Sequence, residues 1–325
     1  MPWRSFPRAA LWIGVGLLLL APYTSGAQAR RQFTIPYRPV GDNGSPLIQV
    51  QLPNGLSGNF VFDTGADISV LTDTMADRLG LRPKPAYGAD GRPLLLDAGR
   101  PAQVVQTTAR FGGVAYTGPF LVVPEQSLAI GAGPPVDGLI GAETLARFAV
   151  LFNFKRREIT LLTPGKLSPD EISRLDMAEA FVIPRASTGK LPFYVTARLN
   201  GRVDADLVID TGGATTYLPL SAVRQLKLKP RQRGLHSRTV YGDLKKNRTT
   251  LKTLTLGPMV FKEEEVEYSE QEQDNFPPHI GMSILAWYYV LIDFPADTLY
   301  MKPGLRDLKM QEAREAPQRE TESKP

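Results

Sequence analysis

Apolar and polar residues alternate in short runs along the chain, and several of these runs end at a turn signal. The alternation at 48–52 stops at Asn54-Gly55, and the alternation at 195–199 stops at Asn200-Gly201. Asn-Gly after an alternating run is a strong hairpin signal, because both residues adopt positive φ easily. Two continuous apolar runs, Phe60-Val61-Phe62 and Leu207-Val208-Ile209, are typical of buried strands. The pattern therefore predicts a mostly β fold built from many short strands.

These elements recur in the same order, so the chain contains an internal repeat. Segment 63–83 reads DTGADISVLTDTMADRLGLRP, and segment 210–230 reads DTGGATTYLPLSAVRQLKLKP. The two align without a gap and share Asp-Thr-Gly, a later Leu and a final Leu-x-Pro. Each copy follows an apolar strand and continues into a short predicted helix. In the first copy Thr72 is the expected N-cap of that helix, and Gly80 is the expected stop.

Further landmarks divide the chain into units. Segment 139–145, LIGAETL, matches segment 279–285, HIGMSIL, near the end of each copy. We therefore predict two homologous halves, 30–163 and 181–303. Between them, Ser168 and Glu171 fit a capping box with Pro at the first helical position, which predicts a helical linker at 164–180. The charged segment 304–325 is predicted to be a disordered tail.

The first 29 residues have the order of a secretory signal peptide. Arg4 and Arg8 precede an apolar run at 9–22, and small residues follow up to Ala29. The run is shorter than the roughly 20 residues that a membrane-spanning helix needs. We therefore expect cleavage and a secreted or periplasmic protein without stable membrane insertion. An uncleaved membrane anchor is the alternative.

Composition excludes several kinds of site. The chain has no cysteine, which excludes disulfides, thiolate nucleophiles and Cys-based metal centres. Its two histidines, His236 and His279, lack the spacing of metal ligands, and we expect neither a metal nor a cofactor. The net charge of +5 is not accompanied by a basic and aromatic pattern, so nucleic-acid binding is not expected. The acidic run at 263–274 is interpreted as an exposed loop.

The two Asp-Thr-Gly turns carry the candidate chemistry. One such turn after a strand is usually only a turn, but two copies place Asp63 and Asp210 at equivalent points of two halves. Two carboxyls about 3 Å apart cannot both ionise, so they share one proton. The ionised member then activates water, and the protonated member donates to a peptide carbonyl. Small glycines and loop-fixing threonines support this arrangement, namely Gly65, Gly212, Thr64 and Thr211.

Two segments resemble a known family. Segment 62–71, FDTGADISVL, resembles the active-site segment of retropepsin-like aspartic proteases. Segment 138–154, GLIGAETLARFAVLFNF, resembles their Ile-Gly, helix and strand element, and the second half carries both elements as well. The resemblance covers about 33–303. It implies two acid-protease β-barrel halves related by pseudo-twofold symmetry, with a short helix in each half and a cleft for a polypeptide substrate. It also implies hairpin flaps, for which the candidates are Tyr87, Gly88, Tyr241 and Gly242.

Three functional hypotheses remain open at this point. The leading one is an aspartic endopeptidase that uses both carboxyls of one chain and acts as a monomer. In the second, halves of different chains pair in a dimer to form the sites. The third is a non-catalytic peptide-binding or scaffold protein that retains the fold.

The two motifs also depart from the pepsin pattern. Ala66 and Gly213 follow the motif glycines, where a hydroxyl would donate to the carboxylate and lower its pKa. We therefore expect a dyad that works at less acidic pH than that of pepsin. Gly213-Ala214 in place of Ala66-Asp67 predicts a looser second loop.

Overall fold

The computed structural model describes residues 30–41, 44–87, 91–95, 101–128, 133–239, 242–271 and 276–304. The predicted signal peptide and all of the predicted tail except Gly304 lie outside these ranges. Within them, no helix combines the length and the apolar character needed to cross a membrane.

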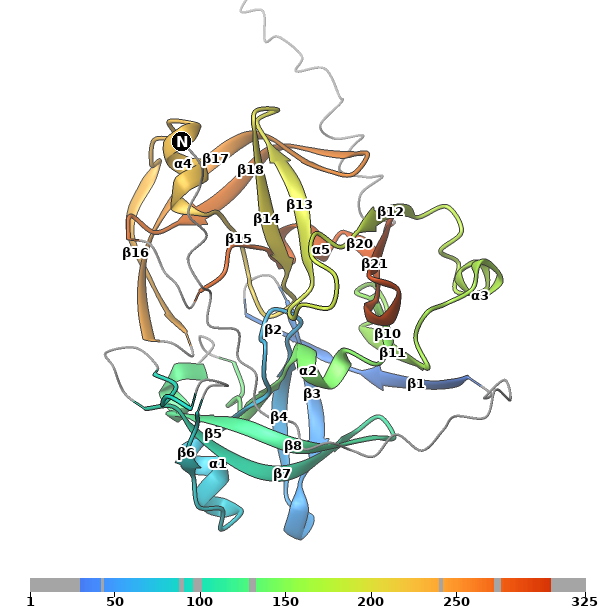
Figure 1. Ribbon diagram of the computed structural model, residues 1–325, viewed down its shortest axis with the longest axis vertical. Helices are drawn as coiled ribbons and strands as arrows, with labels where there is room; N and C mark the ends of the chain where they lie inside the picture. The colour runs from blue at the N-terminus through green and yellow to red at the C-terminus, as the bar shows by residue number, and fades with distance from the viewer. Residues whose placement is uncertain are drawn as a thin grey trace, which may run out of the picture.

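The described part of the first half forms an eight-stranded sheet in the order β2-β3-β4-β9-β5-β8-β7-β6, in the lower part of Figure 1. Its strands are β2 (Arg38–Val40), β3 (Ser45–Gln51), β4 (Ser57–Phe62), β5 (Val70–Thr72), β6 (Lys84–Pro85), β7 (Gln103–Phe111), β8 (Val114–Val123) and β9 (Gly138–Ile140). The Asn54-Gly55 turn between β3 and β4 has positive φ at both residues, as its sequence predicts.

The described part of the second half forms a seven-stranded sheet in the order β13-β14-β19-β15-β18-β17-β16. Its strands are β13 (Tyr194–Leu199), β14 (Val203–Ile209), β15 (Thr216–Tyr217), β16 (Gln232–Thr239), β17 (Gly242–Leu256), β18 (Met259–Tyr268) and β19 (His279–Ile280). This order repeats that of the first half strand for strand, except that the first sheet has the additional edge strand β2. The repeat predicted from the sequence is therefore also a repeat of the strand order in the two sheets.

A six-stranded sheet joins the two halves in the order β1-β11-β10-β20-β21-β12. Its strands are β1 (Arg31–Pro36), β10 (Ala149–Asn153), β11 (Glu158–Thr163), β12 (Phe181–Pro184), β20 (Tyr288–Asp293) and β21 (Thr298–Pro303). At its centre Leu151 of β10 pairs with Leu291 of β20. On either side, Val150 pairs with Ile292 and Phe152 pairs with Val290. This reciprocal register places the pseudo-twofold axis between β10 and β20.

Short helices complete each half. The α-helices are α1 (Asp73–Arg78), α2 (Ala142–Leu145), α3 (Pro169–Arg174), α4 (Leu220–Gln225) and α5 (Met282–Leu285), and 3-10 turns are η1 (Pro53–Gly55), η3 (Glu125–Leu128) and η4 (Phe294–Ala296). Thr72 caps α1 by accepting from the Met75 amide, and Ser168 and Glu171 form the expected capping box on α3. Each half has two described short helices: one follows the Asp-Thr-Gly loop, as predicted, and the other follows the Ile-Gly segment, as the resemblance implies.

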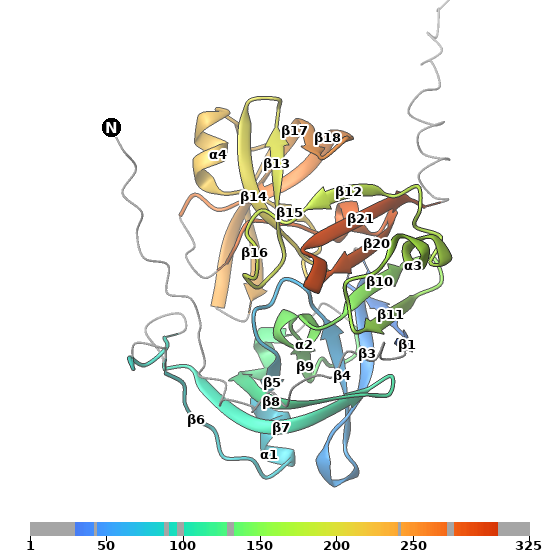
Figure 2. The ribbon, with the colours of Figure 1, turned by 45° about the vertical axis from the view of Figure 1, so that its right-hand side comes forward.

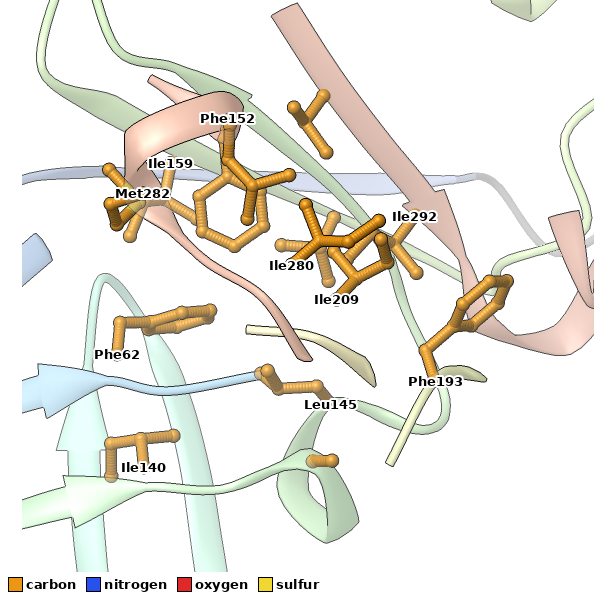
Figure 3. Close-up of a cluster of buried hydrophobic side chains, with 14 of the residues drawn as sticks. Phe62, Ile140, Leu145, Phe152, Ile159, Phe193, Ile209, Ile280, Met282 and Ile292 are labelled. Atoms are coloured by element: carbon orange, nitrogen blue, oxygen red, sulfur yellow. The ribbon is translucent and has the colours of Figure 1, made fainter. Parts of the chain in front are cut away.

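The main hydrophobic core receives side chains from both halves. Figure 3 shows Phe62, which ends β4, and Ile209, which ends β14, directed into one cluster with Phe152 and Ile292 of the joining sheet. All four side chains are fully buried. Since packed interiors resist displacement, this cluster fixes the strand ends that immediately precede the two Asp-Thr-Gly motifs.

One sequence interpretation was wrong. The acidic run at 263–274 was interpreted as a loop, yet its first part continues β18 to Tyr268. Glu267 is buried there and pairs with Lys246 and Arg248 of the neighbouring strand β17. Opposite charges on adjacent strands stabilise a sheet, so residues 263–268 of the run belong to a strand whose partner lies elsewhere in the sequence.

Candidate active site

Equivalent loops position Asp63 and Asp210. Each aspartate directly follows a central strand, β4 or β14, and its amide donates to a carbonyl of the strand alongside. Asp63 N–H donates to Ile140 O at 3.0 Å, and Asp210 N–H donates to Ile280 O at 3.0 Å. Figure 2 shows the two halves, first below and second above, meeting where these strands end. The sheets therefore present both carboxyls at the seam.

Each carboxylate is held by the amides of its own loop. Asp63 Oδ1 accepts from the Gly65 and Ala66 amides at 2.8 and 3.2 Å. Asp210 Oδ1 accepts from the Gly212 and Gly213 amides at 2.8 and 2.7 Å. One oxygen of each carboxyl is thereby fixed toward the backbone. The two carboxyl groups lie near each other, because each faces the motif glycine of the other loop.

Gly65 and Gly212 make this close approach possible. A Cβ at Gly65 would lie 2.3 Å from the Asp210 Cγ, and a Cβ at Gly212 would lie 2.4 Å from the Asp63 Cγ. Neither separation is compatible with a side chain, because real Cβ atoms do not approach other heavy atoms so closely. Each loop therefore needs glycine where it faces the carboxyl of the other half.

Thr64 and Thr211 link the two loops below the carboxyls. The Thr64 hydroxyl donates to Ile209 O at 2.6 Å, and the Thr211 hydroxyl donates to Phe62 O at 2.6 Å. Each hydroxyl oxygen also accepts from the other threonine's amide, at 3.1 and 3.2 Å. Both side chains are fully buried. Six polar atoms are thus paired with one another, which gives the seam a fixed geometry.

Burial and mutual repulsion leave the pair with a retained proton. Burial raises the pKa of Asp63 to about 8, and the charge of Asp210 adds to this shift, while the loop amides oppose it. Burial also raises the pKa of Asp210, against the opposing effect of the Gly213 and Gly212 amides and of the hydrogen bond from Asp63. A singly protonated pair results, since two adjacent carboxylates repel each other. Such a pair holds both an acid and a base at one point.

The structure describes two of the four flap candidates, Tyr87 and Gly242. Tyr87 is 53% exposed and forms an isolated antiparallel bridge with Pro93. Gly242 begins β17 and pairs with Thr239 at the end of the hairpin formed by β16 and β17. Strand β16 also contacts η3 of the first half, so this hairpin reaches across the seam. Gly88 and Tyr241 lie outside the described residues, and the covering role of both flap segments stays a prediction.

Two residues beside the loops, the partly buried Glu143 and the buried His279, were missed as site residues by the sequence reasoning. Glu143 braces the first loop by accepting from the Ser69 amide at 2.8 Å and from the Thr144 hydroxyl at 3.1 Å. His279 of β19 lies beside Asp210, with 3.6 Å between Nδ1 and Oδ2. The sequence does contain a signal for both residues, because each stands at a position where the two repeat copies differ. Glu143 stands opposite Ser283 and His279 stands opposite Leu139 in the otherwise matching LIGAETL and HIGMSIL segments.

Comparison with known proteins matches both halves to one family. Residues 48–144 and residues 195–284 each match the family model described as aspartyl protease, and together they cover more than half of the chain. Both matches include an Asp-Thr-Gly loop and the following Ile-Gly segment. No curated protein matches the chain.

Proposed function

The chain belongs to the aspartyl protease family, and on that premise we propose that it is an endopeptidase with Asp63 and Asp210 as its catalytic pair. One observation carries the proposal: equivalent loops of the two halves bring the carboxyls of Asp63 and Asp210 together, each facing the motif glycine of the other loop. Thr64, Gly65, Thr211 and Gly212 act by holding these loops in register.

The proposed reaction follows from the protonation state of the pair. The ionised carboxylate takes a proton from water while the water oxygen attacks the peptide carbonyl carbon. The protonated carboxyl donates to the carbonyl oxygen as it gains charge. Collapse of the tetrahedral intermediate breaks the C–N bond, and the leaving nitrogen receives a proton from the pair. The substrate is therefore a polypeptide, and the fixed loops keep acid and base aligned on one bond.

The geometry favours a complete site within one chain. The same chain supplies both loops, and the joining sheet pairs β10 with β20 of that chain. A monomer therefore suffices for the proposed reaction, whereas the dimeric alternative needs these contacts to be exchanged between chains. Light scattering on the active protein distinguishes these cases by its mass in solution, which is that of one chain for the monomer and of two chains for the dimer.

A diverse peptide library tests the activity directly. We expect internal peptide bonds to be cleaved over some part of the range from about pH 3 to about pH 8, in which carboxyl pairs of this kind titrate. Asp63→Asn and Asp210→Asn are each expected to reduce the rate by at least about 10²-fold, the lower bound for loss of acid–base catalysis. Absence of cleavage, or cleavage that persists in both variants, contradicts the proposal and favours a non-catalytic peptide-binding role.

We further propose that the protein acts outside the cytoplasm, in the periplasm or as a secreted enzyme. The support is the order of basic, apolar and small residues at 4–29. N-terminal sequencing of the protein recovered from culture medium or periplasm tests this. A first residue at Gln28 or Arg30 is the expected result, and retention of Met1 contradicts it.

A further inference from the structure

The two halves differ beside their aspartates in a way that breaks the symmetry of the site. In the first half Leu139 lies on β9, next to the strand that leads to Asp63. At the equivalent place on β19 the second half has His279. The sheet positions are matched, because Leu139 pairs with Val70 of β5 and His279 pairs with Tyr217 of β15. Only Asp210 therefore has an ionisable ring at this place.

The ring of His279 is fixed and surrounded by oxygen acceptors. Its Nδ1 lies 3.0 Å from Pro277 O and its Nε2 lies 3.1 Å from Thr215 O. Asp210 Oδ2 is a third acceptor, 3.6 Å from Nδ1. Tyr217 stacks on the ring, with 5.8 Å between centroids. The side chain is only 4% exposed, so its orientation is set by packing.

Gly213 gives the ring its access to the carboxylate. A Cβ at this position would lie 2.8 Å from Asp210 Oδ2 and 2.8 Å from His279 Nε2. The first loop has Ala66 at the equivalent position, facing no histidine. Gly213 therefore has a specific role: it leaves the space between Asp210 and His279 free of a side chain.

The acceptors favour the protonated ring, and burial opposes it. A neutral imidazole has one N–H and satisfies one of the two carbonyls, whereas an imidazolium donates to both. Burial lowers the pKa of His279, and Lys246 of β17 acts in the same direction. The Pro277 and Thr215 carbonyls and the charge of Asp63 act against this shift. Lys246 is itself paired with Glu267 of β18, which weakens its effect on the ring.

We propose that His279 is a positioning residue that takes up a proton on acidification and keeps Asp210 as the ionised member of the pair, leaving Asp63 as the acid. The catalytic meaning of this assignment rests on the proposed function. Asp210 is the one carboxylate within 4 Å of the ring nitrogens in the described part of the chain, so by distance the protonated ring stabilises a negative charge on Asp210 more than one on Asp63. It therefore delays the second protonation of the pair, which would remove the base. Activity is thereby extended toward lower pH.

Nuclear magnetic resonance tests the coupling without any substrate. The chain has two histidines, so His236→Gln assigns both sets of ring signals. We expect the ring of His279 to gain a proton as the pH falls while the protein stays folded. Asp210→Asn should lower its titration midpoint by about one pH unit or more, from the loss of a charge at this separation, and Asp63→Asn should lower it less. A ring that stays neutral throughout, or a midpoint unchanged in Asp210→Asn, overturns the proposal.

The pH dependence of peptide cleavage provides the second test. His279→Gln keeps an amide that donates to one carbonyl but carries no charge. We expect the acidic limb of kcat/KM to move upward by about one pH unit, with little change at the basic limb. Leu139→Met at the equivalent position of the first half is the matched control, and both limbs of its pH profile are expected to stay in place.

An unmoved acidic limb in a folded His279→Gln variant overturns the inference. Absence of cleavage in the wild type defeats the proposed function alone, since the resonance titration still decides the role of His279.

Discussion

Thr64 and Thr211 exchange hydrogen bonds across the seam, each accepting from the other's amide and donating to the strand that precedes the other's loop. The four bonds lie in a fully buried environment. They make the position of either aspartate dependent on the loop of the opposite half. The relative placement of the two carboxyls is therefore a property of the whole chain and not of either half.

Removal of one threonine hydroxyl should weaken the whole seam. Thr64→Val and Thr211→Val each leave a buried carbonyl and a buried amide of the other half unpaired. We expect each to lower the free energy of unfolding by about 1–3 kcal/mol, the usual cost of an unsatisfied buried group. The double variant should cost less than the sum, because both hydroxyls belong to one network. Chemical denaturation measures all three, and strict additivity contradicts the network.

Gly65→Ala should disturb the pair more than an ordinary glycine replacement. The new methyl group would lie 2.3 Å from the Asp210 Cγ, so the loop and the carboxyl must separate. We expect peptide cleavage to fall by at least about 10²-fold, as for other misplacements of about 1 Å in an active site. Gly201→Ala, in the turn after β13, has no heavy atom within 4 Å of the new methyl group and serves as control. Gly201 has φ +64°, so this control should cost about 1 kcal/mol in stability and leave cleavage intact.

Asp63→Asn should stabilise the protein as the pH rises. The pKa of Asp63 is raised from 3.8 to about 8 in the folded chain. Between these values the folded chain keeps a proton that the unfolded chain has lost, so stability falls with increasing pH. Asn removes this titration, and the variant should gain at least about 1 kcal/mol relative to the wild type near pH 8. The gain should vanish as the pH falls below about 4, where the unfolded wild type also becomes protonated.

Thermal unfolding of both proteins across this pH range measures the effect. Asp77→Asn, on the exposed side of α1, provides the reference for loss of a surface carboxyl. A difference between Asp63→Asn and the wild type that does not grow with pH contradicts a retained proton in the folded state.

Local signals in the sequence predicted most of the architecture around the pair. An Asn-Gly turn, a Thr N-cap and an apolar strand act within a few residues, so Asn54, Thr72 and the run at 60–62 could be interpreted without a partner. The repeat then placed Asp63 and Asp210 in equivalent settings. Their catalytic role stays a proposal, as do the domain boundaries.

Features that depend on distant partners were not predictable in the same way. The acidic residue Glu267 lies in a strand because Lys246 and Arg248 face it from β17. His279 is significant because Asp210 lies 3.6 Å away, although 69 positions separate them in the sequence. Neither residue has a local pattern that identifies its neighbour. Comparison of the two copies would have marked His279, since it replaces a leucine in a matched segment.

The pH profile of peptide cleavage should lie well above that of an enzyme with hydroxyl donors at the pair. Ala66 and Gly213 follow the motif glycines and bring no hydroxyl to the carboxylates, while burial raises the pKa of Asp63 to about 8. Loss of the shared proton sets the basic limb of kcat/KM, so activity should persist at neutral pH and decline near about pH 8. Circular dichroism over the same range separates this decline from unfolding.

Ala66→Ser tests the cause of the high pH range. A serine hydroxyl that donates a hydrogen bond to Asp63 stabilises the carboxylate and should move the basic limb to lower pH. A wild-type profile that peaks well below about pH 4, or a basic limb that rises in Ala66→Ser, contradicts this account of the pair.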